Sequence, residues 1–261
     1  MPGLPLIKRL CFALAAALLY FSAPSLSLAQ VSDTELRLAE VAANELGRAI
    51  VSTSSQAQMP RISDPKIAAQ FAVMLPESAS RGDVPDIAEM ARLADLAELS
   101  GRMVRAYVLA GTGSNSNAGL NEDGRQMAGR NFITFLPEIA TLYDYRVRIA
   151  ARLSQGGSAL RSTLSPDRLE DPAVKEAMLA IDDTVTGVIV SVLGCAADDK
   201  IDQNWRLERL TLLQSRVSDF AGLLETKPAQ AIADQSLAAA ISEQGSPLAA
   251  PFKDFALSIL R

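Results

Sequence analysis

The side chains that carry most enzyme chemistry are scarce in this sequence, which contains no histidine and only two cysteines. Without histidine the chain cannot build a Ser–His–Asp triad, a histidine-ligated haem or most zinc sites, and it lacks the usual general base. Any catalysis would rest on carboxylates, lysine, tyrosine, serine or Cys195. The expected state of Cys195 is a small buried thiol. The sequence therefore predicts no cofactor, no metal site and no specific catalytic residue.

The best local candidate for a catalytic acid is Glu77, which directly precedes Ser78. Lytic transglycosylases cleave cell-wall glycan with one Glu before a Ser, and a desolvated carboxyl suffices as the acid. The Gly-Leu-Met-Gln motif of that family is absent here. The segment most similar to the Ala-Tyr-Asn-Ala-Gly motif of that family is residues 106–111, and it contains no Asn. A solvated loop residue is the simpler interpretation of Glu77, and a carboxylate-dependent hydrolase remains an alternative function.

The acidic run 198–202, DDKID, is a second candidate, for calcium. An EF-hand loop places oxygen ligands at alternating positions, with Gly at the sixth and Glu at the twelfth. This run lacks that Gly, and Lys200 interrupts it. We therefore expect a helix end followed by a helix cap.

A basic segment adjoins an acidic one in the middle of the chain. Residues 125–168 contain seven Arg and three acids, whereas residues 169–204 contain eight acids and two Lys. The simpler interpretation is that neighbouring helices pair their charges or are solvated. The alternative is a patch that binds an acidic partner, composed of Tyr143, Tyr145, Arg146, Arg148 and Arg152.

The N-terminus has the layout of a cleavable signal peptide. Two basic residues, Lys8 and Arg9, precede an uncharged, mostly apolar run from Leu10 to Ala23. A run of 14 residues is too short to cross a hydrocarbon core about 30 Å thick. Residues 27–29, Ser-Leu-Ala, then supply small side chains at the positions that a signal peptidase reads.

Cleavage near Ala29 divides the chain into a signal peptide, residues 1–29, and one helical domain, residues 30–261. We expect this domain in the periplasm or outside the cell, without a stable membrane span. It would carry 23 basic and 30 acidic residues. This excess of acids argues against nucleic acid and anionic membrane surfaces as partners. Sparse aromatics and abundant Ala and Leu favour closely packed helices.

Capping signals, prolines and apolar periodicity predict an all-α fold, a multi-helix bundle of antiparallel type. Pro137 lies within a helical pattern and predicts a kink there, and the pair Gly156-Gly157 predicts a loop over 154–171. The predicted helices cover residues 32–53, 64–75, 85–110, 122–135, 138–153, 172–197, 201–225 and 228–243, with a short one ending at Leu260.

The segment 184–197, TVTGVIVSVLGCAA, carries no charge. A helix that is apolar on every side is expected at the centre of a bundle, buried all round. Gly187, Ser191 and Cys195 follow at intervals of four residues and would form one face that a neighbouring backbone can approach closely.

These patterns favour a non-catalytic binding, scaffold or accessory protein of the cell envelope, whose partner is another envelope protein. One alternative is a helical carrier of an apolar small molecule, bound beside the uncharged helix. The other is the glycan hydrolase introduced above.

Overall fold

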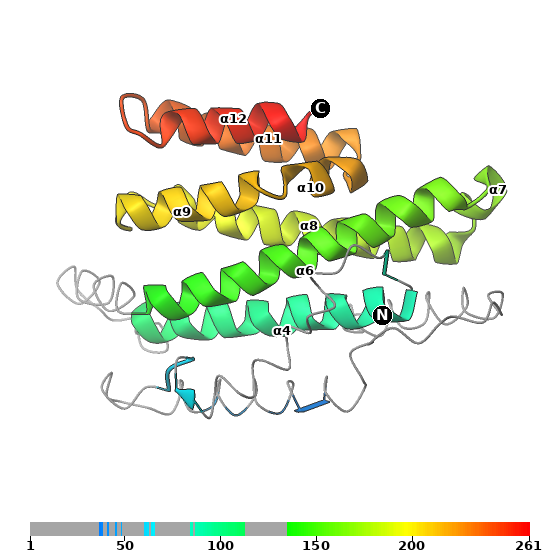
Figure 1. The fold of residues 1–261 in the computed structure, drawn as a ribbon, viewed down its shortest axis with the longest axis horizontal. Helices are drawn as coiled ribbons and strands as arrows, with labels where there is room; N and C mark the ends of the chain where they lie inside the picture. The colour runs from blue at the N-terminus through cyan, green and yellow to red at the C-terminus, as the bar shows by residue number, and fades with distance from the viewer. Residues whose placement is uncertain are drawn as a thin grey trace, which may run out of the picture. The chain divides into compact units, whose positions relative to one another are not determined.

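The computed structural model describes residues 37, 38, 41, 45, 48, 60–62, 64, 65, 84, 85, 87–112 and 135–261. This described part is all-helical, with eight helices and no strand, which confirms the predicted all-α class (Figure 1). The expected signal peptide and Glu77 lie outside the described residues. The helices are α4 (Ile87–Thr112), α6 (Leu136–Thr163), α7 (Pro166–Leu169), α8 (Pro172–Ala196), α9 (Gln203–Gln214), α10 (Val217–Leu223), α11 (Thr226–Ser242) and α12 (Ala249–Ile259).

The chain divides into two compact units. Of the described residues, the larger unit contains 84–97 and 147–261, and the smaller unit contains 98–146 together with the positions between 37 and 65. Helices α4 and α6 each run through both units. Each unit has its own fully buried aromatic side chains: Phe220, Phe252 and Phe255 in the larger unit, and Tyr107, Phe135 and Tyr143 in the smaller one.

The C-terminal helices of the larger unit pack in layers. Helices α11 and α12 form a hairpin, and α12 also contacts α9 and α10, while α8 contacts α9 and α11 (Figure 1). Gly245 closes the hairpin turn with φ of 89°, a conformation that L side chains rarely adopt. The buried Ser236 hydroxyl on α11 donates to the Phe252 carbonyl at 2.7 Å, which ties the two helices together.

Helix α6 differs from the prediction at both ends. Pro137 lies in its first turn, where the missing backbone N–H costs nothing, so it starts the helix and does not kink it. The helix also continues through Gly156 and Gly157 to Thr163, and the predicted loop over 154–171 is wrong. Both glycines are packing contacts: a Cβ at Gly156 would lie 2.5 Å from Met90 Sδ, and one at Gly157 would lie 2.6 Å from Leu223 Cδ1. Tertiary packing therefore overrides the low helix propensity of glycine.

The predicted long helix over 201–225 is instead two helices, α9 and α10, with a break at Ser215 and Arg216. The Ser215 hydroxyl donates to the Leu212 carbonyl at 2.7 Å, which ends α9. Both α9 and α10 contact α12.

Helices α8 and α9 both begin at an aspartate cap. The Asp171 carboxylate accepts from the backbone N–H of Ala173 at 2.9 Å and starts α8. The Asp202 carboxylate accepts from the N–H groups of Asn204 and Trp205 and starts α9. Asp198 accepts from the Lys200 N–H at 3.0 Å at the end of α8. The acidic run 198–202 is thus a helix end followed by a cap, as its sequence predicts.

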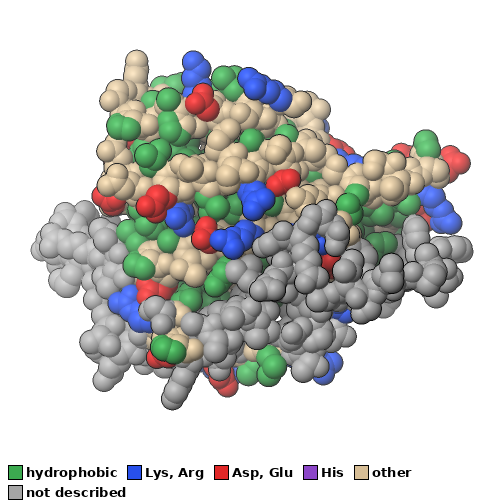
Figure 2. Space-filling model, viewed as in Figure 1, with side chains coloured by type: hydrophobic (Ala, Val, Ile, Leu, Met, Phe, Trp, Pro, Cys, Tyr) green, Lys and Arg blue, Asp and Glu red, His purple; other side chains and the backbone are tan. Residues whose placement is uncertain are grey.

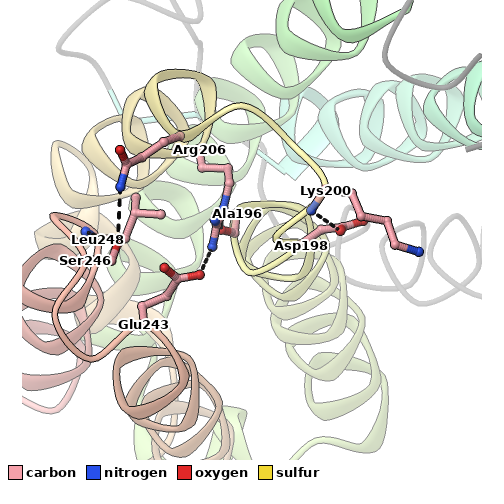
Figure 3. Close-up of polar contacts among 8 residues, drawn as sticks. Ala196, Asp198, Lys200, Arg206, Glu243, Ser246 and Leu248 are labelled. Atoms are coloured by element: carbon pink, nitrogen blue, oxygen red, sulfur yellow. Dashed lines mark hydrogen bonds and ion pairs between the residues drawn. The ribbon is translucent and has the colours of Figure 1, made fainter. Parts of the chain in front are cut away.

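A buried arginine fixes the end of α8 in the larger unit. Arg206 Nε donates to the carbonyl of Ala196 at 2.6 Å, and its guanidinium also pairs with Glu243 at the end of α11 (Figure 3). The hydrogen bond from Arg206 holds the pKa of the Glu243 carboxyl below its ordinary value. Because the guanidinium satisfies an orphan carbonyl at a helix C-terminus, it links α8, α9 and α11 at one point.

In the smaller unit, the segment 60–65 is held to α4 and α6 by polar and aromatic contacts. Tyr107 donates to the Pro60 carbonyl at 3.1 Å, and Arg61 pairs with the buried Glu138 at 3.1 Å. The Arg61 guanidinium also lies 4.8 Å from the ring centroid of Phe135. Burial and the nearby Glu138 raise the pKa of Tyr107 above its ordinary value. The tyrosine therefore remains a hydrogen-bond donor at any physiological pH.

Candidate functional site

Helix α8 is buried on one side and exposed on the other. Its buried side chains include Ile181, Val185, Val188, Ile189 and Val192. The expectation that the segment 184–197 is buried all round is therefore wrong. The helix is covered by neighbours over part of its circumference only, because each helix that packs against it covers a limited arc.

All exposed residues between positions 176 and 197 lie on one line along α8 and its C-cap residue, and we name this line the α8 stripe. At 100° per residue, the intervals of three and four place them within about 80° of arc. Leu179 is 61% exposed and Val190 is 38% exposed. The α8 stripe consists of Glu176, Leu179, Asp183, Gly187, Val190, Gly194 and Ala197.

The two glycines of the α8 stripe have no packing role within the described chain. A Cβ built on Gly187 or Gly194 meets no atom within 4 Å. By contrast, a Cβ on Gly101 would lie 2.0 Å from a guanidinium nitrogen of Arg146, and one on Gly156 would collide with Met90. Glycine inside a helix costs roughly 0.5–1 kcal/mol relative to alanine. Gly187 and Gly194 therefore weaken α8 without a compensating contact among the described residues.

Neighbouring helices hold α8 in place from its buried side. Asp182 is 5% exposed, and its Oδ2 accepts from Arg161 of α6 at 2.8 Å. The Arg161 guanidinium also donates to the Leu223 carbonyl and lies 3.5 Å from Glu225, so it joins α6, α8 and the corner between α10 and α11. The second carboxylate oxygen of Asp182 is buried without a hydrogen-bond partner. Burial raises the pKa of Asp182 to about 6, although Arg161 acts in the opposite direction.

A similar ion pair joins α4 to α6 within the larger unit. Arg152 Nε lies 3.1 Å from Glu89 Oε1, and a second guanidinium nitrogen lies 3.4 Å from Glu89 Oε2. Both ion pairs join positions 21 or more residues apart, Arg161 with Asp182 and Arg152 with Glu89. Of the two, only the pair Arg161–Asp182 joins the basic segment 125–168 to the acidic segment 169–204, and it supports the simpler interpretation of the charge asymmetry.

The five residues of the predicted partner patch all lie on α6 but not on one exposed surface. Tyr143, Arg146 and Arg152 are buried, Tyr145 is half-buried and Arg148 is exposed. Burial and the nearby Arg105 lower the pKa of Arg146. On the face drawn in Figure 2, basic and acidic side chains of the described residues are interspersed and do not form a continuous basic area. Of the five, only the side chains of Tyr145 and Arg148 reach the surface.

The described residues contain no group of three or more His, Cys, Asp or Glu side chains placed to hold a metal ion. Cys195 is half-buried at the edge of the α8 stripe. By length and composition, α8 is the one helix in the described part that could cross a membrane, and half of its apolar window is buried in the protein. Core helices of globular proteins meet the same criteria, so this is weak evidence for a membrane span.

The sequence pattern located the uncharged helix but not its exposed line. Gly187 belongs both to the α8 stripe and to the predicted face, whereas Ser191 and Cys195 are half-buried beside it. The spacing 187, 190, 194 and 197 could have been read as a second candidate face, since it follows the helical repeat equally well. The chain matches no protein-family model, no curated protein and no solved structure.

Proposed function

We propose that the mature chain is a non-catalytic binding or scaffold protein of the cell envelope, a multi-helix bundle of antiparallel type that acts through the α8 stripe. The observation that carries this proposal is the pair of exposed glycines, Gly187 and Gly194, around which the described chain leaves open space. Such positions let a second backbone approach closely. They suit a helical partner better than a small polar substrate.

Three properties of the chain support a binding role. The uncharged half of the α8 stripe, from Gly187 to Ala197, offers apolar surface without a charge to desolvate. On its buried side, α8 is held rigidly by two contacts. Asp182 pairs with Arg161 of α6, and Arg206, which also pairs with Glu243, holds the C-terminal end of α8. A rigid helix loses little conformational entropy on binding, which favours affinity. The predicted signal peptide supports action in the envelope.

The test is site-specific photo-crosslinking in cells that export the protein. A photoreactive amino acid at Val190 should capture a partner, whereas the same probe at the exposed Lys253 of α12 should not. A second substitution, Gly187→Leu, should abolish capture from Val190 because the larger side chain blocks close approach. The folded state should tolerate this change, since nothing lies within 4 Å of a Cβ at Gly187.

Two results would contradict the proposal. Capture that is equal from Val190 and Lys253 would show that the α8 stripe is an ordinary solvated surface. Capture from Val190 that survives Gly187→Leu would show that the partner does not approach the glycines. The thermal melting temperature of each variant serves as the control for folding.

A further inference from the structure

We propose that the corner between α10 and α11 is a pH-controlled latch, which is closed on α6 while the Asp182 carboxyl is neutral and opens when this carboxyl is ionised. The latch consists of residues 223–225, where α10 ends and α11 begins. It goes beyond the proposed function, because it involves the buried side of α8 and does not depend on the α8 stripe.

The latch packs on α6 through a leucine side chain that fits a notch. Leu223 is fully buried, and a Cβ built on Gly157 of α6 would lie 2.6 Å from its Cδ1. The leucine therefore occupies the space that the missing side chain of Gly157 leaves. Between the helices, Leu224 has an extended backbone and Glu225 makes no side-chain cap for α11. Backbone groups at such helix ends open more readily than those inside a helix.

Arg161 of α6 connects the latch to Asp182 of α8. Its guanidinium donates to the Leu223 carbonyl, pairs with Asp182 Oδ2 at 2.8 Å and lies 3.5 Å from Glu225. One group thus satisfies a free carbonyl at the end of α10 and also provides the counter-charge for Asp182. Movement of residues 223–225 away from α6 breaks the contact with Leu223 and lets water reach the carboxyl.

The surroundings of Asp182 favour its neutral form while the latch is closed. The side chain is buried, and its Oδ1 has no hydrogen-bond partner. Apart from Arg161, the charged groups that act on it are two acids, Glu225 and Asp183. The three α4 side chains that pack against the start of α8 are apolar and offer no further counter-charge. A buried oxygen of an ionised carboxylate costs free energy without a donor, and hydration removes this cost.

Ionisation of Asp182 therefore favours the open latch. Water reaches the carboxyl in the open form, so the pKa of Asp182 there lies near its ordinary value of 3.8, whereas burial raises it to about 6 in the closed form. Because the closed form binds the proton more tightly, the open fraction rises with pH, roughly tenfold between pH 5 and pH 7.5. Opening uncovers Leu223 and the notch at Gly157, an apolar surface that the closed form hides.

Native-state hydrogen exchange of the purified full chain, followed by NMR, tests the latch. The Leu224 amide donates to the Phe220 carbonyl at 3.0 Å and reports opening of the latch. The amide of the fully buried Phe255 on α12 reports global unfolding. After correction for intrinsic exchange rates, the protection of Leu224 should be roughly tenfold lower at pH 7.5 than at pH 5. It should also be well below that of Phe255 at both pH values, because local opening is more frequent than global unfolding.

Two variants separate the charge of Asp182 from charge loss in general. Asp182→Asn should make the protection of Leu224 independent of pH, because asparagine does not titrate. Asp183→Asn is the matched control at the exposed neighbouring position and should keep the pH dependence of the parent.

A disulfide tests whether movement of the latch away from α6 is required. A Cβ built on Gly222 of α10 lies 3.6 Å from the Ser158 Oγ of α6, close enough for a disulfide between these positions. Ser158→Cys combined with Gly222→Cys, with Cys195→Ser to remove the native thiol, should keep the latch closed when oxidised. The protection of Leu224 should then be high and independent of pH, and reduction should restore the pH dependence.

Three results would overturn the latch. Protection of Leu224 that is equal at the two pH values, or higher at pH 7.5, would show that ionisation of Asp182 does not favour opening. Equal protection of Leu224 and Phe255 would show that residues 223–225 open only when the whole protein unfolds. A pH dependence that persists in Asp182→Asn or in the oxidised disulfide variant would assign the effect to a different group or movement.

Discussion

The buried carboxyl of Asp182 should make the protein less stable as pH rises. Most carboxyl groups in folded proteins have the opposite effect. Asp182 Oδ2 pairs with Arg161 at 2.8 Å, but the other oxygen of Asp182 is buried without a hydrogen-bond partner. Besides Arg161 of α6, the charged groups that act on it are Glu225, next to the start of α11, and Asp183 of α8. Burial outweighs Arg161, and the pKa rises from 3.8 to about 6.

The magnitude follows from proton linkage. A shift from 3.8 to about 6 corresponds to about 3 kcal/mol at 1.36 kcal/mol per pH unit. Because the folded state binds this proton more tightly than the unfolded state, the contribution of Asp182 to stability is fully present below pH 3.8. It is lost as pH rises through about 6. Between pH 4 and pH 7.5, the expected loss from this group is about 2 to 3 kcal/mol.

Asp182→Asn isolates this contribution, since asparagine has nearly the same shape and does not titrate. Urea unfolding of the parent and the variant at pH 4 and pH 7.5 gives the change in free energy of unfolding at each pH. The variant should gain about 2 to 3 kcal/mol relative to the parent between the two conditions. Asp183→Asn, at the exposed neighbouring position, controls for the loss of one charge and should change stability by only a few tenths of a kcal/mol.

The reasoning would be refuted if the difference between Asp182→Asn and the parent were the same at both pH values. A difference of opposite sign, with the variant relatively weaker at pH 7.5, would show that the ion pair with Arg161 outweighs burial. An NMR titration of the Asp182 carboxyl gives an independent measurement of the pKa.

Replacing Arg206 with Met should cost about 3 kcal/mol in urea unfolding, because it leaves the Ala196 carbonyl without its donor. The pKa of Glu243 should rise toward its ordinary value in the same variant, which NMR titration can follow. Gly156→Leu should destabilise the protein by about 1–3 kcal/mol, since a Cβ there already lies 2.5 Å from Met90 Sδ; an unchanged midpoint would contradict the close contact of α4 and α6. N-terminal sequencing of exported protein should begin within a few residues of Gln30, and a product that retains Met1 would refute the signal peptide.

The helices themselves could be predicted where local signals were strong. The ranges expected for α4, α8 and α11, and the end expected for α12, agree with the structure within a few residues. The start of α8 could be predicted because its cap, Asp171, satisfies a backbone N–H group only two residues away. An interaction between residues this close in the sequence can be predicted from the sequence alone.

Features that depend on distant neighbours could not be predicted. Gly156-Gly157 predicts a loop by local propensity, and only the contacts of α6 with Met90 and Leu223 show why the helix continues through it. The ion pair between Glu89 and Arg152 joins residues 63 positions apart, which no local pattern contains. The break between α9 and α10, both of which contact α12, was likewise not predicted.

The sequence by itself determined the all-helical class, the caps and the absence of histidine-based chemistry, because these follow from residue types and from interactions within one helical turn. The tertiary structure alone decided which side of α8 is exposed. Its segment 184–197 is uncharged on every face, so the sequence contains no charged residue there to mark the surface. Only the positions of the helices around α8 leave Gly187, Val190 and Gly194 uncovered, and burial by distant segments is a property that no local pattern contains.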